Sequence, residues 1–150
     1  VRSSTGNMPV PKERAIRQMI RSLRKNDILG ILIDQNVAWY EGVFVDFFGR
    51  PACTTNGLAA LALYEEAPVI PGYIVRLENG KYRLVLREEM EVVRTGNDNE
   101  DIVTNTQNFT KVIEDTVRQY PDQWLWIHQR WKTKPWQVEK VQLEERVTSR

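Results

Sequence analysis

The feature that most constrains the fold is an apolar run at residues 28–33, Ile-Leu-Gly-Ile-Leu-Ile, which ends abruptly in Asp34, Gln35 and Asn36. Apolar side chains on both faces are typical of a parallel strand that is covered on both sides in an α/β protein. Ligands of such proteins bind at the carboxyl ends of the strands. We therefore expect a buried strand at 28–33, with Asp34 either at a ligand site or capping a turn.

The flanking patterns also predict α/β architecture. A helix is expected within 11–27, where Ile16, Met19, Ile20 and Leu23 have helical spacing. A strand and loop should follow at 42–52, and then a helix from about Thr55 that ends before Pro68. Asn79-Gly80 predicts a hairpin between 69–77 and 81–87, with another short strand at 90–93. A long amphipathic helix over 102–117 should end before Pro121.

The composition limits the classes of function. The chain has 150 residues, enough for one domain, and a formal net charge of only +1, so any charged partner must be recognised by local charge. The one cysteine excludes an internal disulfide. No apolar run approaches the roughly 20 residues of a membrane-spanning helix. Phosphate-binding glycine loops, nucleophile elbows and zinc motifs are absent from the sequence, so no metal site is expected.

Two residues raise the possibility of nucleophilic catalysis. Cys53 and the only histidine, His128, are in principle a nucleophile and its base. Cys53, however, stands among small residues at the predicted helix start, where an inert side chain is common. His128 lies among tryptophans, which favours a packed and hydrogen-bonded ring.

Two stretches have the composition of an anion-binding surface. Arg50 is able to bind a phosphate or carboxylate together with Thr54, Thr55 and the start of the next helix, or it is a surface arginine beside a turn. The second stretch is aromatic and basic, and it suits an anionic lipid surface or a nucleic acid equally. Its tryptophans and cations are Arg130, Trp131, Lys132, Lys134 and Trp136. The basic face of the first helix is either solvated or rests on anionic lipid or an acidic carrier protein.

Five blocks in this order carry a family resemblance: RSSTGN from Arg2, ILIDQN up to Asn36, GVFVDFFGRPACTTNGLAALAL from Gly42, APVIPGYIVR up to Arg76, and YPDQWLWIHQRWKTKP from Tyr120. In these blocks the chain resembles the C-terminal half of the lipid A biosynthesis acyltransferases, the lauroyl and myristoyl transferases. That family is related to the glycerol-phosphate acyltransferases. The final tryptophan-rich block argues against a glycerol-phosphate acceptor in this chain.

The resemblance implies a fold and an activity. The fold would be the C-terminal portion of a glycerol-phosphate-acyltransferase-like α/β domain at 1–136, with a mostly parallel central sheet, flanking helices and one hairpin, and 137–150 would be a charged tail. The activity would be transfer of a fatty acyl chain from acyl-acyl-carrier-protein to a hydroxyl of a lipid A precursor, with no metal or cofactor. Its location would be the cytoplasmic side of the inner membrane in Gram-negative bacteria. The alternative is a non-catalytic module that binds anionic lipid or nucleic acid.

The family mechanism requires a His-x-x-x-x-Asp/Glu motif, whose imidazole takes the proton of the acceptor hydroxyl. His128 does not fit this motif, because Thr133 stands five positions later. The motif is expected upstream of Val1, as is a membrane-anchoring helix, and the chain alone is expected to be inactive. The substrate-binding residues implied here are Arg2, Asp34, Gln35, Arg50, Thr55 and Gly57. The face left open by a missing half makes self-association plausible.

Overall fold

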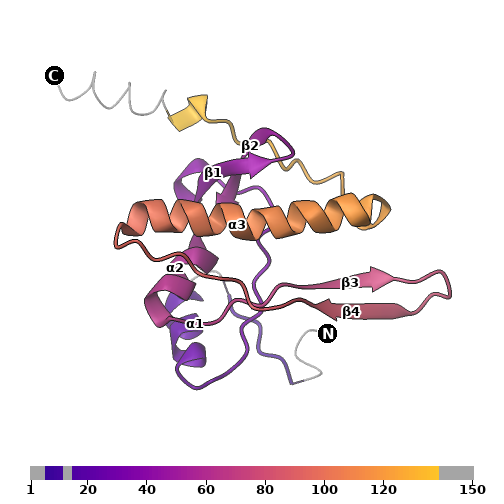
Figure 1. Ribbon diagram of the computed structural model, residues 1–150, viewed down its shortest axis with the longest axis horizontal. Coiled ribbons are helices and arrows are strands. Elements are labelled where there is room, and N and C mark those ends of the chain that lie inside the picture. The colour runs from indigo at the N-terminus through magenta and orange to yellow at the C-terminus, as the bar shows by residue number, and fades with distance from the viewer. Residues whose placement is uncertain (1–5, 12–14, 139–150) are drawn as a thin grey trace.

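A computed structural model describes residues 6–11 and 15–138. Its helices are α1 (Ala15–Leu23), α2 (Gly57–Glu65) and α3 (Asp98–Gln119), with short 3-10 turns at Trp39–Glu41 and Pro121–Gln123. Two antiparallel hairpins pair β1 (Gly42–Phe47) with β2 (Arg50–Thr55), and β3 (Gly72–Arg76) with β4 (Tyr82–Leu86). The long helix α3 lies between the two hairpins, and β3–β4 projects from the body (Figure 1).

The first hairpin differs from the sequence prediction. Residues 50–55 form a strand, and the following helix begins at Gly57 rather than at Thr55. The two strands are joined at Phe48-Gly49, where both residues have positive φ, 57° and 73°, as a tight two-residue hairpin turn requires. The amide of Phe48 donates to Glu114 Oε2 at 2.8 Å, which fixes the turn on α3. Cys53 is therefore a buried strand residue, and the prediction of a helix start there was wrong.

The second hairpin and the long helix were predicted correctly. The β3–β4 register runs from Gly72 opposite Leu86 to Arg76 opposite Tyr82, with Asn79-Gly80 in the turn. Beyond it, 90–93 contributes only a single bridge, Met90 to Val69, instead of a strand. Helix α3 begins at a side-chain cap, where Asn97 accepts from the amide of Glu100, and ends just before Pro121.

Residues 28–33 belong to no strand, and they make no backbone hydrogen bond to another described residue. Ile33 is buried, but Ile28 is 99% exposed and Leu32 is 83% exposed. In the described part of the chain no second strand pairs with this segment, and Ile28 and Leu32 pack against little. The expected burial on both faces is absent here.

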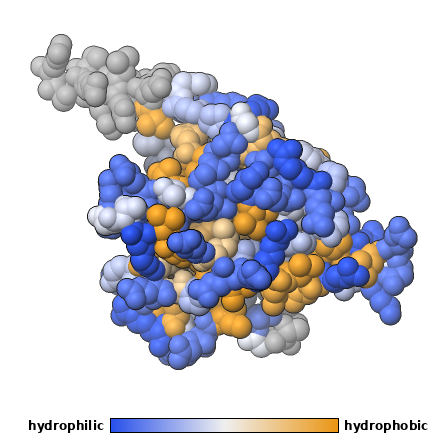
Figure 2. All heavy atoms as spheres, viewed as in Figure 1, coloured by the Kyte–Doolittle hydropathy of each residue, from blue (hydrophilic) through white to orange (hydrophobic). Residues whose placement is uncertain are grey.

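The core consists of two clusters that lie along α3. Phe109 packs with Ile33, Ala59, Ala62 and Val69, whereas Val117 packs with Phe47 and Ala52. Ile113 contacts both clusters, so α3 joins them. In the projecting hairpin Val75 is buried, whereas Ile74, Tyr82, Leu84 and Leu86 remain exposed. Apolar side chains gather where the hairpin meets the body (Figure 2).

Candidate functional site

An apolar groove of about 710 Å³ opens between residues 28–34 and α3. Its remaining walls are residues 68–75, Leu58, Met90 and the segment after α3, with Gln123 and Trp124. The groove volume lies within the roughly 300–1,000 Å³ of small-molecule sites. Asp34 is the only charged residue in the lining that the structure describes. The groove therefore combines an apolar channel with a single carboxylate.

Asp34 stands in a turn that is held by the C-terminal segment. The amide of Asn36 donates to His128 Nε2 at 2.8 Å. The side chain of Asn36 accepts from the amide of Thr133 and donates to its hydroxyl, both at 3.0 Å. The Thr133 hydroxyl donates to the carbonyl of Val37 at 2.7 Å. The expected packed, hydrogen-bonded His128 is confirmed. Its Nε2 lone pair is already occupied, because it accepts the hydrogen bond from the Asn36 amide.

Arg130 lies in the same region and is only 1% exposed. One terminal nitrogen donates to the Cys53 carbonyl at 2.9 Å and the other to the Thr54 hydroxyl, while Nε has no partner among the described residues. Burial lowers the pKa of Arg130 below its ordinary value, and the negative charge of Asp34 acts in the opposite direction. Arg130 is thus a buried cation bonded to β2, next to the residue whose carbonyl also accepts from the Val37 amide of the turn.

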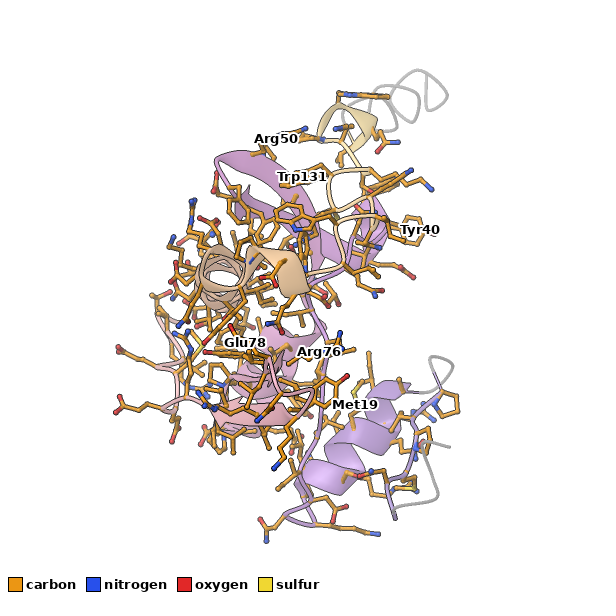
Figure 3. All side chains as sticks on the ribbon, turned by 90° about the vertical axis from the view of Figure 1, so that its right-hand side faces the viewer. Met19, Tyr40, Arg50, Arg76, Glu78 and Trp131 are labelled. Atoms are coloured by element: carbon orange, nitrogen blue, oxygen red, sulfur yellow. The ribbon has the colours of Figure 1, made fainter. Side chains whose placement is uncertain are left out.

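The other predicted site residues do not join this arrangement. Arg50 is exposed, and its guanidinium lies 4.7 Å from the ring centre of Trp131 (Figure 3). Thr55 stands at the opposite end of β2, about 16 Å away at roughly 3.3 Å per residue. The Thr55 hydroxyl accepts from the amide of Gly57 at 3.4 Å, a contact within the turn before α2. Gln35 is exposed, and Arg2 lies outside the described residues.

The proposed Cys53–His128 nucleophile pair is not formed. His128 Nε2 accepts from Asn36, whereas the thiol of Cys53 contacts the carbonyl of Ala38 at 3.6 Å. Burial raises the pKa of the Cys53 thiol, which disfavours the reactive thiolate. Cys53 is therefore an inert buried side chain and His128 a hydrogen-bonded ring, which are the structural alternatives that the sequence indicated for them.

The sequence did not identify Arg130 as a site residue, because a basic residue between tryptophans suggested a surface. The ring centre of Phe47 lies 5.5 Å from that of Trp124 and 5.6 Å from that of Trp131, so neither tryptophan is a free stacking platform. In the described ranges no group of histidine, cysteine or acidic residues is suited to a metal ion. No helix in the described part of the chain has the length and apolarity to cross a membrane.

Comparison with known proteins gives the family. The model of the bacterial lipid A biosynthesis acyltransferases matches residues 1–133. The chain belongs to this family. A lipid A biosynthesis acyltransferase of Haemophilus influenzae is 31% identical over 82% of the chain, and the palmitoleoyltransferase of Escherichia coli K12 is 30% identical over 80%. The lauroyltransferase of the same organism is 28% identical over 86%.

The chain spans only part of the length of these relatives. The matched region covers 37% of the H. influenzae protein, 38% of the palmitoleoyltransferase and 42% of the lauroyltransferase. The groove and the turn at Asp34 both lie within the residues that match the family.

Proposed function

We propose that this chain provides the lipid-binding part of an acyltransferase that acts on a lipid A precursor. The observation that carries the proposal is the apolar groove with Asp34 as its one charged lining residue among those described. An acyl chain suits the apolar walls, where each buried methylene contributes about 0.8 kcal/mol. In this proposal the Asp34 carboxylate accepts a hydrogen bond from a sugar hydroxyl of the same lipid.

The reaction assigned to the complete protein is direct transfer. The acceptor hydroxyl attacks the thioester of acyl-acyl-carrier-protein, its proton passes to a base, and the carrier thiol leaves. The base would be the histidine of a His-x-x-x-x-Asp/Glu motif, which residues 1–150 lack. His128 is unsuited to this role because its Nε2 accepts from Asn36. We therefore expect the chain to bind the lipid without transferring an acyl group.

The same proposal includes the location of the reaction and the sheet to which residues 28–33 belong. Because the acceptor is a lipid, the reaction is assigned to a membrane surface, and the family resemblance favours the cytoplasmic side of the inner membrane. We assign residues 28–33 to a parallel strand that pairs with strands from the rest of the protein, in a glycerol-phosphate-acyltransferase-like sheet. Support comes from the exposed apolar side chains of this segment and from its backbone, which forms no hydrogen bond to a backbone group of another described residue.

Lipid binding tests the proposal directly. A tetra-acylated lipid A precursor in detergent micelles is titrated while the fluorescence of the chain, which has Trp124 in the groove, is recorded. Asp34→Asn should weaken binding about tenfold, whereas Glu78→Gln, at an exposed carboxylate of the β3–β4 turn, should not. Val112→Trp fills the groove and should also weaken binding, whereas Val103→Trp, on the same helix outside the groove, should leave it unchanged.

The length of the acyl chain gives a second measurement. Two extra methylenes should strengthen binding by about tenfold, since they add roughly 1.6 kcal/mol when fully buried. Affinity that is independent of chain length, or equal loss in Val112→Trp and Val103→Trp, would show that the groove is not the lipid site.

A further inference from the structure

The turn that presents Asp34 is not fixed by the segment that leads into it. Residues 28–33 make no backbone hydrogen bond to another described residue, so no sheet determines where Asp34 stands. Asp34 is nevertheless half-buried at the groove, two positions before Asn36, whose amide and side chain are both hydrogen-bonded. The contacts that hold it must therefore come from elsewhere in the chain.

Three residues more than 90 positions later, His128, Arg130 and Thr133, are here called the C-terminal clamp. His128 and Thr133 contact the turn directly, whereas Arg130 bonds to β2. His128 accepts from the amide of Asn36 at 2.8 Å. Thr133 exchanges two hydrogen bonds with the Asn36 side chain and donates a third to the carbonyl of Val37. Both backbone and side chain of the turn are thus oriented by the clamp.

Arg130 connects the turn to β2. It donates to the carbonyl of Cys53 and the hydroxyl of Thr54, and the amide of Val37 donates to the same Cys53 carbonyl at 3.4 Å. Its charge acts on Asp34, yet it forms no ion pair within 4.0 Å in the described part of the chain. A buried cation without such a pair is costly for stability, so its presence beside the turn indicates another role.

We propose that Arg130 is a positioning residue: it fixes the Cys53 carbonyl to which Val37 also donates, and so helps the C-terminal clamp to hold the turn that presents Asp34 to the groove. Arg130 itself is 1% exposed and does not line the groove, so it acts on a ligand through Asp34. The ligand in this inference, a lipid A precursor, rests on the proposed function.

Amide hydrogen exchange of the unliganded chain tests the clamp without any ligand. Arg130→Met should accelerate exchange of the Asn36 and Val37 amides at least tenfold, while the amide of Phe109 in α3 keeps its rate. Thr133→Val removes the hydroxyl contacts with little change in volume and should accelerate Asn36 in the same way, so the test survives if Arg130→Met fails to fold. Arg83→Met, at an exposed arginine of β4, is the matched control. If the Asn36 amide exchanges at an unchanged rate in clamp variants that fold, the clamp does not hold the turn.

A double-mutant cycle on lipid affinity tests the role of Arg130 through Asp34. Arg130→Met and Asp34→Asn should each weaken binding of the tetra-acylated precursor about tenfold, and the double variant should bind no more weakly than Asp34→Asn alone. Arg130→Lys keeps the charge and should recover part of the loss. If the two affinity losses multiply to a hundredfold in the double variant, Arg130 acts independently of Asp34 in a structural role, and the proposal is overturned. Absence of binding by the unsubstituted chain would instead refute the proposed function, and hydrogen exchange would still decide the clamp.

Discussion

Replacing Gly42 by alanine should destabilise the fold because the first residue of β1 has no room for a side chain. A Cβ atom at Gly42 would lie 2.2 Å from the carbonyl oxygen of Thr54 and 2.7 Å from Val37 Cγ2. Favourable carbon contacts begin near 3.5 Å, so the strands must separate by about 1 Å. Thr54 is fully buried and bonded to Arg130, so it resists this movement.

The expected loss is about 2–3 kcal/mol of unfolding free energy, the upper part of the range for overpacked sites. Gly30 is the matched control, since a Cβ there would meet no atom within 4 Å. Gly30→Ala should change the free energy of unfolding by no more than about 0.5 kcal/mol, and we expect the change to be stabilising. Urea unfolding, followed by both tryptophan fluorescence and far-ultraviolet circular dichroism, measures the difference. Equal stability of the two variants would refute the close approach of β1 to Thr54.

Three further outcomes are expected from the described side chains. Phe47→Ala should cost about 3–5 kcal/mol in urea unfolding, because the ring is fully buried among aromatic side chains, whereas Leu84→Ala on the exposed hairpin should cost under about 0.5. Hydrogen bonds from Thr95 lower the pKa of Asp101. Asp101→Asn should therefore lower the melting temperature at neutral pH, and the difference should shrink as the pH falls below about 3.9 towards the folded pKa. Cys53, fully buried with its pKa raised, should react with Ellman's reagent only in denaturant, and native-state labelling would contradict its burial.

Local signals in the sequence were sufficient for α3 and the β3–β4 hairpin. Asn79-Gly80 specifies a turn, and the helical spacing from Ile102 to Val117 specifies a buried face, without reference to distant residues. The β1–β2 turn was missed because Phe48 adopts positive φ, which its side chain does not favour and which its hydrogen bond to Glu114 supports. That hydrogen bond joins residues 66 positions apart, so no local sequence pattern predicts it.

The site was predicted only in part for the same reason. Asp34 could be identified because a carboxylate directly after an apolar run is conspicuous. Arg130 could not, since the surrounding tryptophans and lysines resemble an exposed interface, and only the fold shows that it is buried beneath β2. Arg50 matched the composition of an anion site, but its guanidinium instead packs against Trp131.

The backbone at 28–33, which pairs with no other part of the described chain, also affects how the isolated chain behaves at high concentration. A segment whose amide and carbonyl groups are open in this way is a template for the corresponding segment of another copy. Ile28 and Leu32 add exposed apolar side chains to this template. Since a copy that docks by one edge still offers the other, we expect growth beyond a pair, with a particle size in light scattering that rises steadily with protein concentration. Soluble preparations would then depend on dilution, or on a charged replacement at Ile28, more than on any change to the core.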